Sequence, residues 1–175
     1  KTADKHNIYG YFENLDIIRI EEMILKKLDG NFHSLPNIKP NWSNDFKREK
    51  KQLKKIVKKD NIEVYKGNRL LVISELFEKT FPDAKWIYIE RNVEDTFKSR
   101  FGTPMTIEEW TKLTDKRISI WNNSTAAKNA LKLTYESFFH NPEKQVTEIA
   151  SYLNVNLSEK QFADCMDFFK PRKNG

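Results

Sequence analysis

Apolar residues recur at steps of three and four along several stretches of the 175-residue chain, a spacing that places them on one face of a helix. In the first stretch, apolar side chains stand at positions 17, 20, 24 and 28, after Asn14, whose residue type often caps helix N-termini. Gly30 then suits the left-handed position just beyond a helix. Comparable spacing predicts further helices over 47–59, 70–81, 93–100, 107–121, 142–153 and 158–169.

Three short segments have the composition of β-strands. Residues 62–65 alternate between apolar and polar, and residues 131–135 form another candidate. Residues 86–89 are almost continuously apolar, which is typical of a strand buried on both faces of a parallel sheet. Strands that alternate with helices predict an α/β fold of three layers, with a parallel sheet between helices.

The ends of the chain affect the domain prediction. Three strands make a thin parallel sheet, so we expect at least one more strand outside this sequence. The chain opens at Lys1 rather than at Met, and no signal-like apolar segment follows. We therefore expect one domain over residues 1–175 that is truncated at its N-terminus.

Composition narrows the class of protein. Hydrophobic residues make up 38% and aromatic residues 13%, enough to bury a core. No apolar run approaches the roughly 20 residues that cross a bilayer, so no membrane segment is expected. The single cysteine, Cys165, excludes an internal disulfide and fits a bacterial cytoplasm. A secretory lumen, reached through a lost N-terminal anchor, is the alternative.

The basic character of the chain is local. The net charge is +6, but the window 47–59 holds eight basic residues and one acid, so the rest of the chain sums to −1. A solvated helix face, a site for an acidic acceptor such as a polysaccharide, and a nucleic-acid surface are the three interpretations. No aromatic residue stands among these lysines, which counts against single-stranded nucleic acid.

Several common catalytic motifs are missing from the sequence. The three histidines are scattered and there is no HExxH or CxxC, so a zinc site is not expected. Neither GxSxG nor GxxxxGK[ST] occurs.

The segment 81–99 is the most informative. Arg91 lies at the carboxyl end of a predicted strand, where ligands bind in open α/β sheets. Ser99 follows eight residues later on the predicted helix. A guanidinium and a hydroxyl in this arrangement can hold a phosphate. The alternative is that Arg91 pairs with a surface acid and Ser99 faces solvent.

This segment, with its Arg-Asn-x-x-Asp-x-x-x-Ser spacing, resembles the 3′-phosphate-binding segment of sulfotransferases that use 3′-phosphoadenosine 5′-phosphosulfate (PAPS). The resemblance implies that Arg91 and Ser99 contact the 3′-phosphate. Val93 stands where that family usually has proline. The stretch 133–138, followed by Asn141 and Pro142, is similar to a later segment of the family and implies that Tyr135 lies near the adenine.

Candidate catalytic residues also follow from the resemblance. Lys66 follows the predicted strand 62–65, where related families place a lysine beside the transferring sulfuryl group. Asn68 stands where some members carry a histidine base. Glu13, in a Gly-Tyr-Phe-Glu element found in several bacterial-type members, is the first alternative base, with Asp16 and His33 behind it. An ordinary acid at a helix start is the competing interpretation of Glu13.

The resemblance implies a P-loop-like sulfotransferase that transfers the sulfuryl group of PAPS to a hydroxyl or amine of a small-molecule or carbohydrate acceptor. It implies no metal and no nucleic-acid partner. The family's 5′-phosphosulfate loop is missing and would precede Lys1, and Asn174 interrupts the C-terminal basic segment of the family. A nucleotide or small-molecule kinase of P-loop type, which would need magnesium, and a non-catalytic nucleotide-binding module stay open as alternatives.

Overall fold

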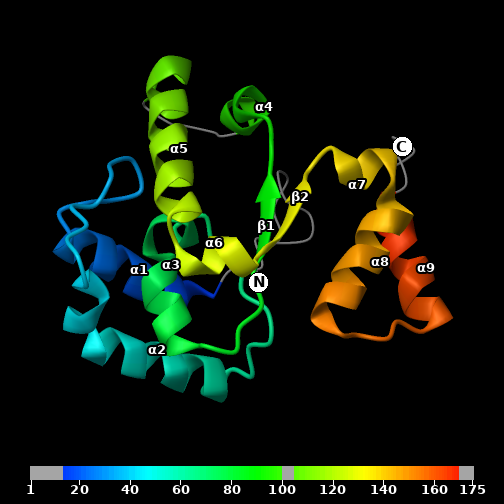
Figure 1. Cartoon of the computed structure of the whole chain (residues 1–175), viewed down its shortest axis with the longest axis horizontal. Helices are drawn as coiled ribbons and strands as arrows, with labels where there is room; N and C mark the ends of the chain where they lie inside the picture. The colour runs from blue at the N-terminus through cyan, green and yellow to red at the C-terminus, as the bar shows by residue number, and fades with distance from the viewer. Residues whose placement is uncertain (1–13, 100–104, 170–175) are drawn as a thin grey trace. The chain divides into compact units, whose positions relative to one another are not determined.

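The computed structural model describes residues 14–99 and 105–169 (Figure 1). Its elements are α1 (Leu15–Lys27), the 3-10 helix η1 (Trp42–Asp45), α2 (Lys47–Lys59), α3 (Leu70–Thr80), β1 (Ile87–Glu90), α4 (Val93–Lys98), α5 (Ile107–Asn122), α6 (Thr125–Asn129), β2 (Leu131–Thr134), α7 (Ser137–His140), α8 (Pro142–Leu153) and α9 (Glu159–Phe169). The fold is mixed α/β, as predicted, and 63% helical.

Two compact units divide the described residues. The helical unit contains the residues up to Ala84 together with Glu108–Ala126. The sheet unit contains Lys85–Ile107 and the residues from Ala127 onward. The predicted functional residues are therefore distributed between the two units.

In the helical unit, α1 begins where Asn14 caps it. The Asn14 side-chain oxygen accepts hydrogen bonds from the backbone N–H groups of Asp16 and Ile17, at 3.0 and 3.1 Å. The prediction that Gly30 takes the left-handed position after α1 is wrong, because Asp29 has the positive φ, 57°. Gly30 instead lies against Pro36, where a Cβ atom would come within 2.7 Å of backbone atoms.

Helix α2 packs against α1 and α3 through its apolar face. Leu53 of α2 and Ile73 and Leu76 of α3 are fully buried. An ion pair also joins the first two helices, because Lys27 Nζ of α1 lies 2.5 Å from Glu49 Oε1 of α2. The remaining side chains of α2 are mostly exposed, as its sequence pattern predicts.

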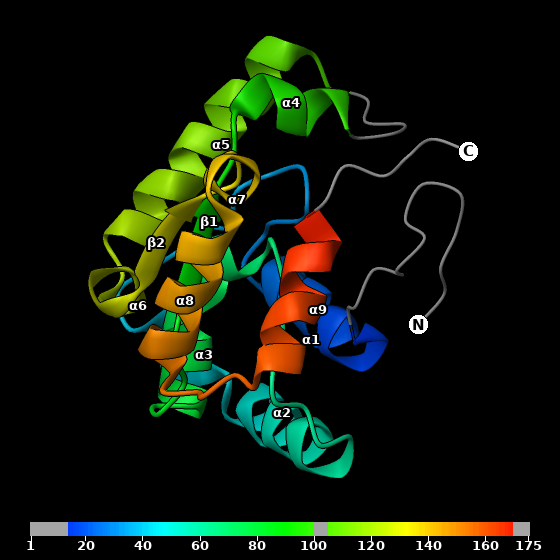
Figure 2. The same ribbon diagram turned by 90° about the vertical axis from the view of Figure 1, so that its right-hand side faces the viewer.

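In the sheet unit, β1 and β2 are parallel and pair Ile87 with Leu131 through to Glu90 with Thr134. Helices α7 and α8 pack on β2, and α9 packs beside α8 (Figure 2). The Tyr152 hydroxyl of α8 accepts a hydrogen bond from Trp86 N (3.2 Å) and donates one to Asn129 O (2.9 Å). This hydroxyl therefore joins the segments that lead into both strands.

Two strand predictions are wrong. Residues 62–65 form no strand and are irregular, and Val64 is 83% exposed. Strand-forming residues adopt a strand only where a neighbour supplies hydrogen bonds and a face to pack on. Strand β1 is also not buried on both faces, since Ile89 is 49% exposed. The sheet of the described residues has two strands, so a three-layer architecture is not confirmed.

The sequence predicts no membrane-spanning segment. Within the described residues, every helix is too short or too polar to cross a bilayer.

Candidate functional site

Arg91 and Tyr135 meet at the carboxyl edge of the parallel strands. Each residue directly follows its strand, and the Tyr135 N–H donates a 2.7 Å hydrogen bond to Glu90 O, which extends the pairing by one residue. The Arg91 guanidinium carbon lies 4.3 Å from the centre of the Tyr135 ring. This is a close cation–π contact, and both side chains are exposed. The register of β1 against β2 therefore creates this part of the site.

Asn92 fixes the turn that presents Arg91. Its side-chain oxygen accepts hydrogen bonds from Glu94 N (2.9 Å) and Asp95 N (3.2 Å), which caps the start of α4. Its own backbone N–H donates to Glu136 Oε1 at 3.3 Å. This hydrogen bond therefore joins the residue that follows Arg91 to the residue that follows Tyr135.

Ser99 closes α4 at the end away from Arg91. Seven residues separate Ser99 from Asn92, so the helical rise places them about 10 Å apart along α4. The exposed Ser99 hydroxyl donates to Thr96 O at 2.8 Å. A ligand that binds Ser99 has to replace this local hydrogen bond. An arginine side chain is long and flexible enough to approach the same ligand from the strand end.

The start of α4 offers little to an anion. The Asn92 side chain already accepts hydrogen bonds from two N–H groups of α4. Two exposed carboxylates, Glu94 and Asp95, also lie in the first turn of this helix. Repulsion from these carboxylates would oppose a phosphate at that position. A phosphate at this edge would therefore depend on the side chains of Arg91 and Ser99.

Aromatic side chains extend the site beyond Tyr135. The Phe139 ring of α7 meets the Tyr135 ring edge-on, with 5.2 Å between their centres, and is 58% exposed. Phe169 of α9 lies next, 6.5 Å from Phe139. An exposed aromatic surface beside a guanidinium suits a flat heterocycle that carries negative charge.

The sequence interpretation missed three residues that build this edge: Asn92, Glu136 and Phe139. The signal for Asn92 was available, because asparagine before a predicted helix is a standard cap. The other two depend on how α7 leaves β2, and no local pattern specifies that.

The candidate catalytic residues lie elsewhere. Lys66, Asp16 and His33 all belong to the helical unit. Lys66 is exposed in the irregular segment before α3, rather than at the end of a strand. Glu13 lies outside the described residues.

The two alternative bases make contacts on the surface of the helical unit. Asp16 forms an ion pair with Arg19 at 3.0 Å, and both side chains are exposed. The His33 ring packs edge-on against Phe32, with 5.3 Å between their centres. Both contacts are ordinary surface interactions, so they leave the identity of the base open.

Lys66 stands three residues before Arg69, which anchors this segment. The Arg69 guanidinium forms ion pairs with Glu22 (2.9 Å) and with the buried Glu21 (3.8 Å) of α1. It also lies 5.1 Å from the centre of the Phe32 ring. Arg69 is therefore held by its ion pairs with α1, whereas Lys66 is exposed to solvent.

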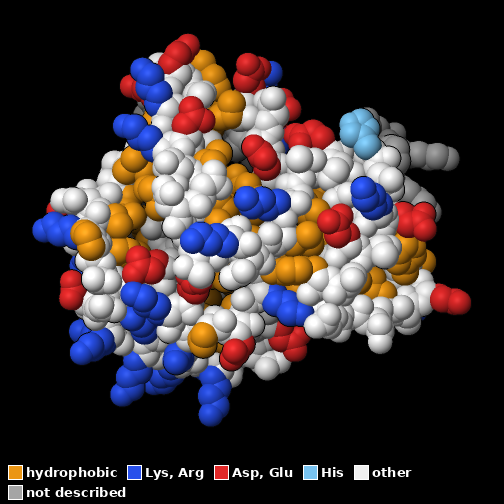
Figure 3. Space-filling model, viewed as in Figure 1, with side chains coloured by type: hydrophobic (Ala, Val, Ile, Leu, Met, Phe, Trp, Pro, Cys, Tyr) orange, Lys and Arg blue, Asp and Glu red, His pale blue; other side chains and the backbone are white. Residues whose placement is uncertain are grey.

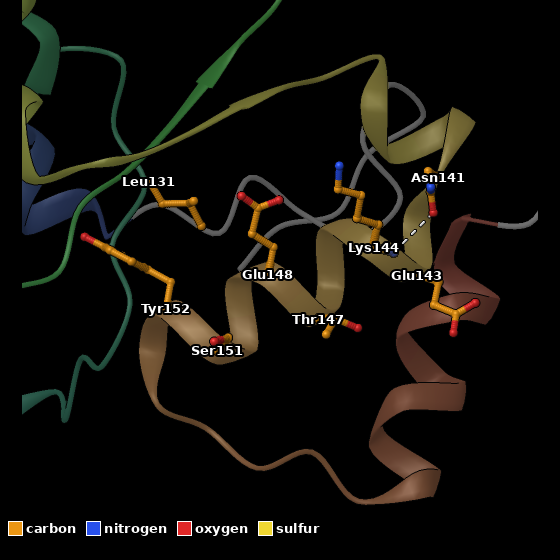
Figure 4. A pocket seen from close by; sticks show the side chains of 8 residues that line it. All are labelled: Leu131, Asn141, Glu143, Lys144, Thr147, Glu148, Ser151 and Tyr152. Atoms are coloured by element: carbon orange, nitrogen blue, oxygen red, sulfur yellow. Dashed lines mark hydrogen bonds between the residues drawn. The ribbon is translucent and has the colours of Figure 1, made fainter.

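A surface hollow of about 710 Å³ lies elsewhere in the sheet unit (Figure 4). It is lined by the start of β2 and one side of α8: Leu131, Asn141, Glu143, Lys144, Thr147, Glu148, Ser151 and Tyr152. Its lining includes two carboxylates and one ammonium, so its charge does not favour an anion. Arg91, Ser99 and Tyr135 do not line it. Among the described residues, no cluster of three or more potential metal-ligating side chains occurs.

Comparisons with known proteins assign no family to the chain. No family model, no curated protein and no solved structure matches the chain.

Proposed function

We propose that the chain binds PAPS and takes part in transfer of its sulfuryl group to a hydroxyl or amine. In this proposal Arg91 and Ser99 hold the 3′-phosphate, and Tyr135 lies beside the adenine. The contact of Arg91 with Tyr135 at the carboxyl edge of two parallel strands is the observation that carries the proposal. Among the described residues no carboxylate forms an ion pair with Arg91, so its charge is available to a phosphate.

The interactions differ in kind. A guanidinium forms two parallel charge-assisted hydrogen bonds to a phosphate, and the Ser99 hydroxyl adds a third. Tyr135 is 38% exposed, so part of its ring can stack on a base. When the nucleotide binds, the contact between the Arg91 guanidinium and the Tyr135 ring would be replaced by contacts of Arg91 with the phosphate and of Tyr135 with the base.

The transfer step follows an in-line geometry. The acceptor oxygen or nitrogen attacks sulfur, the bond from sulfur to the 5′-phosphate oxygen breaks, and 3′-phosphoadenosine 5′-phosphate leaves. A base removes the proton of the acceptor, with Glu13 as first candidate and Asp16 and His33 behind it. Lys66 stabilises the charge that develops on the leaving oxygen. The scheme needs no metal ion.

In the same proposal, the acceptor is a small molecule or a carbohydrate, and the reaction takes place in a reducing compartment such as a cytoplasm. A P-loop kinase and a non-catalytic nucleotide-binding module are the competing functions. Binding of the 3′-phosphate distinguishes a PAPS-dependent sulfotransferase from a P-loop kinase, because the nucleotide donor of a kinase lacks that group.

The test compares two nucleotides by titration calorimetry. Adenosine 3′,5′-bisphosphate should bind the chain more tightly than AMP, which lacks the 3′-phosphate. Replacing Arg91 with alanine should remove most of that difference. A charge-assisted hydrogen bond contributes about 1.5–3 kcal/mol, which corresponds to a roughly 10- to 150-fold loss of affinity.

Arg19→Ala is the matched control, because it removes another exposed arginine, which belongs to the helical unit. It should leave both affinities unchanged. Equal affinity for the two nucleotides, or unchanged affinity in Arg91→Ala, would overturn the proposal. A preference for ATP with magnesium would favour the kinase.

A further inference from the structure

Helix α2 presents a continuous row of positive charge. Four lysines at helical spacing form what we term the lysine stripe: Lys47, Lys51, Lys54 and Lys58. They stand on one side of the helix, and the exposed Arg48, Lys55 and Lys59 flank them. Basic side chains gather along the lower edge of the surface, over α2 (Figure 3). At about 1.5 Å of rise per residue, the stripe is roughly 16 Å long.

Little in the described structure neutralises this charge. The one acid within α2, Glu49, is buried and bound to Lys27 of α1. Asp60, just beyond the helix, lies 3.9 Å from Lys59. None of the lysine stripe forms an ion pair with a described residue. The stripe is therefore free to bind an anion.

The pKa of the half-buried Lys50, next to the stripe on α2, is sensitive to the charges around it. Burial lowers the pKa of Lys50 below its usual value, and the nearby charge of Lys79 lowers it further. The charge of Glu75 acts to raise this pKa, and the charges of Lys47 and Lys54, two members of the stripe, act to lower it. Members of the stripe therefore lie close enough to Lys50 for their charges to act on it.

The helix cannot relieve this repulsion by moving. Leu53 is completely buried on its opposite side, and Glu49 is held by its ion pair with Lys27. The backbone that carries the row of charge is therefore fixed before an anion binds, so the ordering cost on the protein side falls on the lysine side chains.

Two classes of partner fit this surface poorly. A helix that lies on a membrane inserts an apolar face, but the apolar face of α2 is packed inside the helical unit. Single-stranded nucleic acid stacks on exposed aromatic rings, but the aromatic residues nearest to α2, Trp42 and Phe46, are both 4% exposed.

We propose that the lysine stripe binds an anionic polysaccharide, which lies along α2. Point charges on flexible stems suit the separately mobile sulfate or carboxylate groups of such a chain. A polysaccharide also carries the hydroxyls that sulfuryl transfer requires, so the choice of carbohydrate rests on the proposed function.

Binding of heparin, used as a sulfated probe, tests this surface. Fluorescence anisotropy at 50 and 200 mM salt should show heparin binding that weakens with salt, and uncharged dextran should not bind. Changing the four residues of the lysine stripe, Lys47, Lys51, Lys54 and Lys58, to glutamine should weaken heparin binding about tenfold or more. The same positions changed to arginine should keep the affinity, because the charge remains.

The control variant changes four exposed lysines outside α2 to glutamine: Lys112, Lys116, Lys128 and Lys160. It has the same net charge as the α2 variant and should bind heparin nearly as well as the original chain. Equal weakening in both variants would show a general charge effect and overturn the proposal. Circular dichroism checks that each variant keeps its helix content.

Two further outcomes bear on the partner. Single- or double-stranded DNA that binds as tightly as heparin, at equal charge concentration, would overturn the assignment to a polysaccharide. Adenosine 3′,5′-bisphosphate should bind the α2 glutamine variant with unchanged affinity, so failure of the lysine stripe is distinguishable from failure of the nucleotide site. Heparin binding that depends on the stripe supports this inference even if the nucleotide does not bind.

Discussion

Replacing Lys27 with methionine tests whether the ion pair with Glu49 stabilises the packing of α1 on α2. The Glu49 side chain is only 2% exposed and receives the Lys27 ammonium at 2.5 Å. Burial acts to raise the pKa of Glu49, but the hydrogen bond from Lys27, a backbone hydrogen bond and the charges of Lys27 and Arg48 together outweigh it, so the pKa lies below its ordinary value. Methionine keeps most of the aliphatic stem and removes the ammonium, which also lies 5.6 Å from the centre of the Phe46 ring.

The magnitude follows from the burial of each partner. Leaving a buried charge without its partner costs about 3–5 kcal/mol when both groups are buried. The Lys27 side chain is 53% exposed, so solvent already weakens the pair. We therefore expect the free energy of unfolding to fall by about 2 kcal/mol, close to the loss of one charge-assisted hydrogen bond.

The loss should depend on pH. A lowered pKa in the folded state adds stability above the ordinary value of 4.5, and this contribution disappears as the pH falls through the lower folded-state pKa. Lys27→Met should therefore be most destabilising near neutral pH. Its effect should shrink in acid, where a protonated Glu49 no longer needs the ammonium.

Urea unfolding followed by circular dichroism, from neutral pH down to below 4.5, is the assay. Lys26→Met, which changes the exposed neighbour of Lys27, should alter stability by less than about 0.5 kcal/mol. Adding Glu49→Gln to Lys27→Met should recover part of the loss, because the buried charge is gone. A loss that is the same at all pH values, or no larger than that of Lys26→Met, would refute the reasoning.

Two other substitutions test the packing. Gly30→Ala should lower the free energy of unfolding by about 1–3 kcal/mol, because its Cβ would come within 2.7 Å of Pro36 backbone atoms. An unchanged thermal midpoint would mean that the turn yields easily. Tyr152→Phe should cost about 1–2 kcal/mol, since it removes the hydroxyl that joins the segments leading into β1 and β2. Amide exchange should accelerate at Trp86 N, and unchanged protection there would contradict this role.

Local sequence signals predicted the helices well. The spacing of apolar residues located α1, α2, α3, α5, α8 and α9, and Asn14 marked the start of the first. Such signals work because a helix satisfies its backbone hydrogen bonds within one segment. The position of Ser99 at the end of α4 was predictable for the same local reason.

The strands and the site edge depend on partners far along the chain. Residues 62–65 have strand-forming side chains but no strand beside them, whereas 87–90 and 131–134 pair with each other. A strand needs another segment to satisfy its N–H and C=O groups, and the choice of that segment is made in three dimensions. The contact of Arg91 with Tyr135 arises from that same pairing.

The lysine stripe combines both kinds of information. Its charge and its helical spacing can be read from the residues in order. That Glu49 turns inward to Lys27, and so leaves the outer face without an acid, follows from the packing of α1 on α2. A single buried carboxylate thus gains its partner from a segment 22 residues earlier, which no local pattern specifies.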